Sequence, residues 1–156
     1  MNYNENFEQI EKKIRITEHF LYLANSVFQD KKIFLKITPE IKEAVTKTLN
    51  LILYYEAFNK KINLSKDPKA NFEIFKRKCS AKYRITLQEI NKIEELFRIN
   101  EKQKISTMDF IRGEKVIIFL ENQEYEIITS EKLKEFIHIA REILTKAKNK
   151  IENFHS

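Results

Sequence analysis

The side chains best suited to acid–base chemistry in this sequence are two histidines with charged neighbours. His138 has Glu135 three residues before it and Arg141 three residues after it, a spacing that places all three on one side of a helix. Such a strip could transfer a proton, but the same pattern is typical of a solvated helix edge. His19 directly follows Glu18, and consecutive residues in a helix point about 100° apart, so those two side chains do not face each other.

Other catalytic and metal-binding patterns are missing from the sequence. Cys79, the single cysteine, follows three cations that would lower a thiol pKa. Its spacing from Phe72 and Phe75 nevertheless predicts a small buried hydrophobe. A carboxylate-bridged dimetal bundle needs Glu-x-x-His on two helices, and the chain has this pattern once. We therefore expect no catalytic residue, no metal, no cofactor and no small-molecule ligand.

Positive charge is concentrated in one stretch of the chain. The net charge is +6, whereas residues 60–84 alone carry +7. A basic patch is the electrostatic footprint of nucleic-acid binding, so this stretch is a candidate polyanion-binding site. The candidate residues are Lys60, Lys61, Lys66, Lys69, Lys76, Arg77, Lys78, Lys82 and Arg84. A solvated helix face and a surface for an acidic protein partner are the two other interpretations.

Aromatic residues lie among these cations, as they do in many nucleic-acid-binding surfaces. Phe72 and Phe75 share a helix face with Cys79 and are expected in the core. Tyr83 is then the aromatic residue expected to be exposed as a stacking platform. A flat dependence of binding on salt would argue against nucleic acid, because phosphate contacts release counterions.

Helix signals dominate the chain, which holds one glycine and two prolines in 156 residues. We expect a first helix over 5–28, in which Phe20, Leu23 and Val27 widen the apolar stripe and bury it well. A second helix with Thr38 as its N-cap and Pro39 at its first position is apolar nearly all round, Phe58 included, and is expected at the centre of a bundle.

Three further helices and a hairpin complete the predicted order. The Asp67-Pro68 pair starts a helix that extends to about residue 80. Thr86 begins a capping box, and the helix after it has an amphipathic face that includes Leu87. Ser130 caps the last helix, which extends to about residue 151. Residues 106–109 could form a short helical turn. The β-branched and aromatic runs 116–120 and 125–129 predict a β-hairpin.

The predicted fold is therefore mainly α: a single domain over 1–156, built as a bundle of five to six helices with one small β-hairpin (about 116–129) before the last helix. No stretch approaches the ~20 apolar residues of a membrane span. The polar start of the sequence lacks the features of a secretion signal, and the single cysteine suits a reducing compartment. We expect a cytoplasmic protein without membrane contact.

The order of these helices resembles the HEPN superfamily of small helical bundles, including uncharacterised archaeal HEPN-like proteins. The residues that carry the resemblance are Glu18-His19-x-Leu21-x-x-Ala24, Ala44-x-x-x-x-Leu49-x-x-x-Leu53-x-Tyr55-Glu56 and Phe75-Lys76-Arg77-Lys78-Cys79. The resemblance implies dimerisation through helices, partner proteins such as nucleotidyltransferases and, in many members, RNase activity. The RNase motif places four to six residues between Arg and His, whereas Arg15 and His19 are separated by three, so no catalytic residue is carried over.

Three functions remain open at this point. The first is a non-catalytic HEPN-like binding or interaction domain that forms a homodimer or acts with a partner protein. The second is an RNA- or DNA-binding module that uses residues 60–84. The third is a divergent HEPN-type RNase, for which His19 and His138 are the histidines that could be tested for a role in cleavage.

Overall fold

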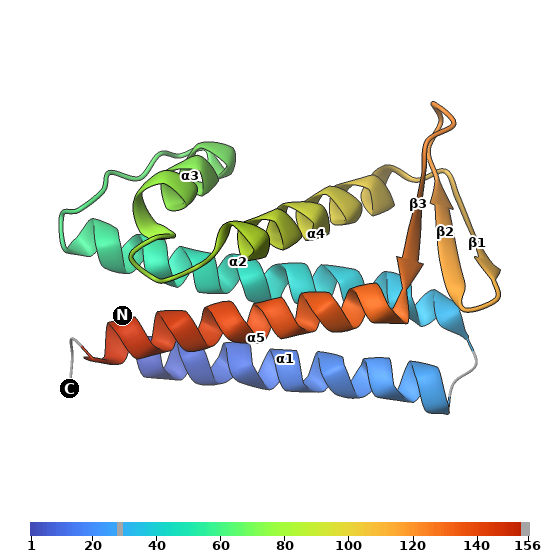
Figure 1. Ribbon diagram of the computed structural model, residues 1–156, viewed down its shortest axis with the longest axis horizontal. Helices are drawn as coiled ribbons and strands as arrows, with labels where there is room; N and C mark the ends of the chain where they lie inside the picture. The colour runs from blue at the N-terminus through green and yellow to red at the C-terminus, as the bar shows by residue number, and fades with distance from the viewer. Residues whose placement is uncertain (28–29, 154–156) are drawn as a thin grey trace.

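Long helices pack side by side in the computed structural model, which describes residues 1–27 and 30–153 (Figure 1). The helices are α1 (Tyr3–Ser26), α2 (Phe34–Phe58), α3 (Pro68–Ile74), α4 (Leu87–Ile105) and α5 (Ser130–Asn153). The 3-10 turn η1 (Lys31–Ile33) precedes α2, and the π-helical turn η2 (Phe75–Cys79) continues α3. Three strands, β1 (Met108–Arg112), β2 (Lys115–Phe119) and β3 (Tyr125–Thr129), separate α4 from α5. The mainly α prediction, with a small sheet before the last helix, is confirmed.

The core of the bundle forms around α2, as its apolar sequence predicts. This helix packs against α1, α4 and α5, and Val45 and Ile52 have no exposed surface. By contrast, α1 buries one face only. Phe20 and Val27, which were expected to widen its buried stripe, are 46% and 62% exposed. Phe28, the expected last residue of α1, lies outside the described residues.

The predicted start of α2 at Thr38-Pro39 is wrong, because the helix begins at Phe34 and runs through the proline. Thr38 is not a cap, since its hydroxyl donates to the Phe34 carbonyl at 3.2 Å. Proline has no N–H to donate to the carbonyl four residues earlier, which here belongs to Leu35. The side-chain amide of Gln103, at the end of α4, donates to that carbonyl instead. The proline is thus tolerated inside the helix because a distant side chain replaces the missing donor.

The chain between α2 and α4 leaves the bundle and returns, and we call residues 59–86 the excursion. The helix-start signals predicted for α3 and α4 are both confirmed. Asp67 accepts a hydrogen bond from the Lys69 backbone N–H at 3.1 Å, and Thr86 and Glu89 form both bonds of a capping box. Leu87, predicted on the apolar face of α4, is instead 72% exposed, whereas Glu89 and Ile90 in the same turn are buried.

The predicted hairpin is present as β2 and β3, which pair antiparallel with Val116 opposite Ile128. Both of these side chains are buried. The helical turn expected at 106–109 is wrong, because Met108 begins the additional strand β1, which pairs antiparallel with β2. Gly113 makes the tight turn between them at φ +64, a conformation that other residues adopt at a cost.

The first turn of α5 is capped one residue earlier than predicted. The Thr129 hydroxyl accepts from the Lys132 backbone N–H at 3.2 Å. Ser130 instead accepts from the Asn25 side chain of α1 at 2.6 Å. No helix in the described part of the chain combines the length and the apolar content that crossing a membrane requires.

Candidate functional site

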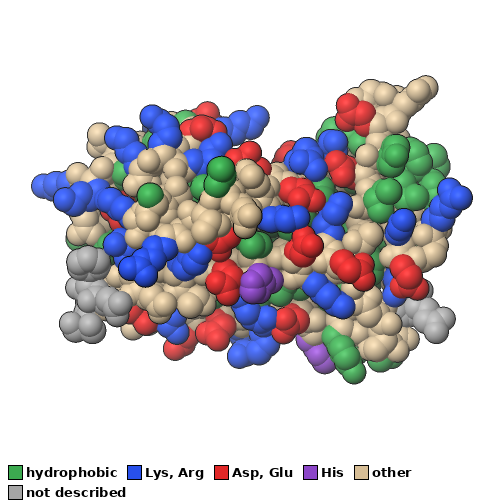
Figure 2. All heavy atoms as spheres, in the orientation of Figure 1, with side chains coloured by type: hydrophobic (Ala, Val, Ile, Leu, Met, Phe, Trp, Pro, Cys, Tyr) green, Lys and Arg blue, Asp and Glu red, His purple; other side chains and the backbone are tan. Residues whose placement is uncertain are grey.

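The candidate polyanion-binding residues all lie on the excursion, at the end of the bundle opposite the sheet (Figure 1). Lys60 and Lys61 follow α2, Lys66 and Lys69 flank the start of α3, and the remaining five lie on η2 and the turn after it. Figure 2 shows Lys and Arg side chains gathered over α3 and the loops beside it. The structure thus keeps together on one part of the surface the charges that the sequence places in one segment.

Two of the nine cations are neutralised by carboxylates. The Lys76 ammonium lies 2.7 Å from Glu73 and 3.4 Å from Glu94, and the hydrogen bond to Glu73 raises the Lys76 pKa. Lys82 lies 3.2 Å from Glu56, which is buried. These two lysines therefore serve the fold and have little charge left for a ligand.

The other seven cations are exposed, and within residues 1–27 and 30–153 they have no ion-pair partner. They are Lys60, Lys61, Lys66, Lys69, Arg77, Lys78 and Arg84. Like charges held together without counter-charges repel one another, and an anionic ligand would relieve that repulsion. We call these seven residues the basic surface.

Two residues of the basic surface have strained backbones. Lys60 has φ 59 and Arg84 has φ 57, in the left-handed region that costs a non-glycine residue roughly 1–2 kcal/mol. Both positions end a helical segment and reverse the chain, where glycine is the usual residue. Cations therefore occupy two positions that glycine would fill with less strain.

Buried side chains hold the excursion against α2. Phe75 and Cys79 have no exposed surface, and Tyr83 is 1% exposed. The prediction that Tyr83 is an exposed stacking platform is therefore wrong. Its hydroxyl donates to the Glu56 carboxylate at 3.1 Å, a partner 27 residues away that local spacing does not indicate.

The buried side chains of Tyr83 and Cys79 stabilise the fold and are held in their protonated forms. Burial, and after it the Glu56 carboxylate, raises the pKa of Tyr83, so the phenol stays neutral and donates its proton to a hydrogen bond. Burial raises the pKa of the Cys79 thiol to about 11. The prediction of a small buried residue at Cys79 is confirmed, and the effect of burial on this pKa outweighs that of Lys82.

The histidine strip of α5 is divided between two ion pairs to other helices. Glu135 pairs with Lys92 of α4 at 2.8 Å. Arg141 donates two hydrogen bonds to Glu18 of α1, one of them at 3.0 Å, and these bonds lower the Glu18 pKa. His138 lies exposed between them, so the charged groups that could assist it are occupied in joining helices.

The other histidines offer no alternative site. His19 is exposed and stacks against Tyr22, with ring centroids 6.4 Å apart, and His155 lies outside the described residues. Among the residues that the structure describes, no group of three or more His, Cys, Asp or Glu side chains is placed to hold a metal ion.

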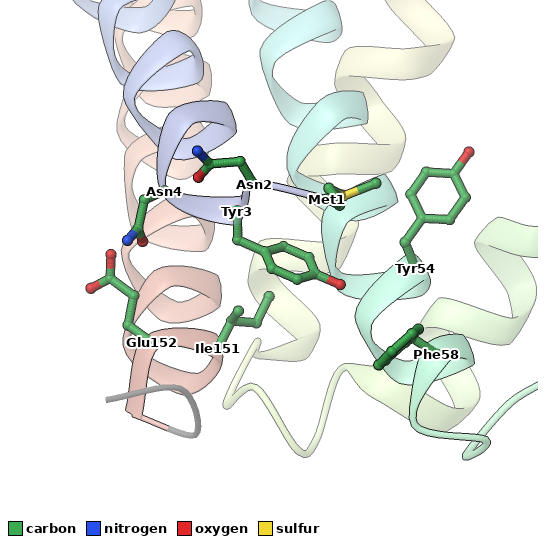
Figure 3. Close-up of a pocket in the computed structure, with 8 residues that line it drawn as sticks. All are labelled: Met1, Asn2, Tyr3, Asn4, Tyr54, Phe58, Ile151 and Glu152. Atoms are coloured by element: carbon green, nitrogen blue, oxygen red, sulfur yellow. The ribbon is translucent and has the colours of Figure 1, made fainter.

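A second surface feature was missed by the sequence analysis, an aromatic groove at the same end of the bundle. It has a volume of about 970 Å³ and is bordered by the start of α1, the end of α2 and the end of α5 (Figure 3). Phe58, expected in the core, is 81% exposed there, and Tyr54 is 49% exposed. Phe58 follows Tyr54 by one helical turn and lies on the same uncovered side of α2, whereas Tyr55 and Glu56 in that turn are buried.

The chain was also compared with known proteins. No protein-family model matches the chain, and no curated protein or solved structure matches it. The resemblance to the HEPN superfamily accordingly stays a prediction. The function has to be inferred from the basic surface and the groove themselves.

Proposed function

We propose that this protein is a non-catalytic binding domain that contacts RNA or DNA through the basic surface. The observation that carries the proposal is the set of seven exposed cations with no ion-pair partner in the described parts of the chain. Nucleic acid is the polyanion whose regularly spaced phosphates suit several cations at once. A cytoplasmic location, expected from the sequence, would give the protein access to both RNA and DNA.

The kind of contact follows from the side chains available. Five of the seven cations are lysines, which act as mobile point charges and have no fixed hydrogen-bonding geometry. Phosphate contacts position a protein on nucleic acid but carry no direct sequence information. The basic surface is therefore expected to bind without marked sequence preference and with a steep dependence on salt.

A charge-matched pair of triple variants tests this proposal. Lys69, Arg77 and Lys78, all changed to Gln, remove three cations of the basic surface. Lys12, Arg15 and Lys134, all changed to Gln, remove three exposed cations of α1 and α5 that likewise have no ion-pair partner among residues 1–27 and 30–153. Because both variants lose the same net charge, only the location of the charge differs.

The measurement is the affinity for a labelled RNA or DNA oligonucleotide over a series of salt concentrations. If the three excursion cations meet phosphates, the slope of log affinity against log salt should fall by roughly 2 to 3 in the first variant. The second variant should keep the wild-type slope. Equal slopes in the two variants, or a flat salt dependence of the wild type, would reject the proposal.

A protein partner is a second candidate function, favoured by the exposed edge of the sheet. β1 is an edge strand, and three of its side chains are exposed although apolar: Met108, Phe110 and Ile111. Edge strands with apolar side chains pair readily with another chain. Such pairing would produce the homodimer or partner complex that the sequence analysis expects.

Sedimentation velocity over a range of concentrations tests this second function. Phe110→Lys should weaken or abolish self-association if β1 pairs with a second copy, because a lysine on an edge strand opposes pairing with another chain. Phe20→Lys, a matched change of an exposed aromatic residue on α1 (46% exposed), should leave it intact. A wild-type protein that stays monomeric at every concentration would exclude the homodimer.

A further inference from the structure

The geometry points to a base-stacking site in the aromatic groove, in which Phe58 and Tyr54 receive unpaired bases of a single strand. This inference rests on the proposed function, since the basic surface supplies the phosphate contacts. It adds the class of nucleic acid, single-stranded, and the residues that would distinguish it from a duplex.

The first argument is the exposure of the two rings. Phe58 exposes 81% of its surface and Tyr54, one helical turn earlier, exposes 49%. Both residues line the groove, in which Figure 3 shows the Phe58 ring on the side of Tyr3 and Ile151 and the Tyr54 ring pointing away from them. Apolar side chains that line a groove on a surface mark a binding site more often than single scattered ones do. Flat aromatic faces suit nucleobases, and stacking on them tolerates any base.

The second argument is the continuity of the groove with positive charge. Lys60 and Lys61 follow Phe58 by two and three residues. The Lys61 backbone N–H donates to the Glu56 carbonyl at 2.9 Å, which turns the chain back and keeps both lysines at the end of α2. Bases seated on Phe58 would therefore have their phosphates beside cations of the basic surface.

The third argument concerns the opposite side of the groove. Glu152 of α5 lines it there and would repel a phosphate, so the backbone of the strand is confined to the side of α2. A duplex keeps its bases stacked on one another, out of reach of the rings. The groove accordingly selects single strands, whereas the lysines alone would accept both forms.

A tryptophan placed at position 58 reports stacking directly, because the chain contains no tryptophan. In Phe58→Trp, the fluorescence should be strongly quenched by a single-stranded oligonucleotide and little affected by the duplex of the same sequence. The control is Phe20→Trp, with the new ring on an exposed part of α1, and it should respond to neither. A Phe58→Trp signal that is unchanged by the single strand, or quenched equally by the duplex, would overturn the inference.

Affinity provides the second measurement. Phe58→Ala should weaken single-strand binding by about tenfold or more, leave duplex binding unchanged and keep the salt slope. An abasic strand of equal length should bind wild type and Phe58→Ala equally. Single-strand affinity that is unchanged in Phe58→Ala, while the salt slope persists, would reject the stacking site but leave the proposed function standing.

Two other occupants of the groove give different results. If Phe58→Ala changed the sedimentation of the protein and not its single-strand affinity, the groove would hold a second copy. If ending the chain at residue 153 raised single-strand affinity to the same extent in wild type and Phe58→Ala, residues 154–156 would occupy the groove. Either result overturns the inference. Absence of any salt-dependent binding by the wild type would instead reject the proposed function itself.

Discussion

The long helices of the bundle and the excursion at its end differ in how often their cations are paired. Several cations of the bundle, though not all, form ion pairs with carboxylates on other helices: Lys13 of α1 lies 2.6 and 2.9 Å from Glu40 and Glu43 of α2, and Arg141 of α5 pairs with Glu18 of α1. In the excursion, seven of nine cations have no such partner in the described ranges. Paired charges align helices, whereas unpaired ones are available to a ligand.

The comparison depends on the excursion being firmly folded. Its position comes from apolar burial of Phe75 and Cys79 and from the bond between Tyr83 and Glu56. The ion pairs of Lys76 with Glu94 and of Lys82 with Glu56 also join it to α4 and α2, whereas the seven cations of the basic surface take no part in positioning it and are available for binding. The four changes below test this division, beginning with the largest expected effect.

Phe75→Ala should lower the free energy of unfolding by about 3–5 kcal/mol, the usual cost of removing a buried phenylalanine ring. Phe75 has no exposed surface, so the cavity would open where the excursion meets α2. Urea unfolding followed by circular dichroism measures the change. A loss below about 1 kcal/mol would show that the excursion does not share the stability of the bundle.

Tyr83→Phe should cost about 1–3 kcal/mol, because it removes a hydrogen bond from the buried Glu56 carboxylate. The ring keeps its packing, so the change isolates the hydroxyl. The matched control is Tyr22→Phe, in which the side chain is 64% exposed and the stability should not change. Equal unfolding midpoints for the two variants would contradict a structural role of the Tyr83 hydroxyl.

Arg84→Gly should raise stability by about 1 kcal/mol, since glycine relieves the left-handed backbone at φ 57. The same change should weaken binding of RNA or DNA, because it removes a cation of the basic surface. Lys78→Gly, within the π-helical turn, removes a cation at a position without that strain and should lower stability by about 1 kcal/mol. Thermal unfolding separates the two, and a loss of stability in Arg84→Gly would contradict the prediction.

The ion pair between Glu18 and Arg141 should contribute about 0.5 kcal/mol, because both side chains are partly exposed. Arg141 lowers the folded-state pKa of Glu18 below 4.5, so this stability is present above pH 4.5 and lost as the pH falls through the folded-state pKa. Glu18→Gln should reduce stability at pH 7 and leave it unchanged once the wild-type carboxylate is protonated. A difference between the two proteins that did not vary with pH would assign the effect to packing.

Local signals in the sequence predicted the parts of the fold that depend on neighbouring residues. The capping box at Thr86 and the Asp67-Pro68 start of α3 depend on bonds spanning three residues or fewer. The start of α2 was mistaken because the partner that makes Pro39 acceptable in a helix, Gln103, lies on another helix. Strand β1 was missed because it contains a single β-branched residue, Ile111, and its side chains are mostly exposed.

The sequence predicted which residues carry the charge of the candidate site, but not which contacts those residues make. The charge of residues 60–84 is visible in the sequence, whereas the pairing of Lys82 with Glu56 needs contacts between distant residues. The two aromatic predictions were reversed for the same reason. Tyr83 finds a buried acceptor, and Phe58 lies with Tyr54 on the side of α2 that other helices leave open.

The buried thiol of Cys79 also has a practical consequence for observing this protein. It is the single cysteine of the chain, and with its pKa at about 11 very little thiolate exists at neutral pH to react with a labelling reagent. A cysteine introduced on the surface would therefore be labelled with a dye or spin label while Cys79 stays unlabelled. In the unchanged protein, a reagent should reach Cys79 only when the excursion separates from α2. The rate of Cys79 modification would therefore measure how often that opening occurs.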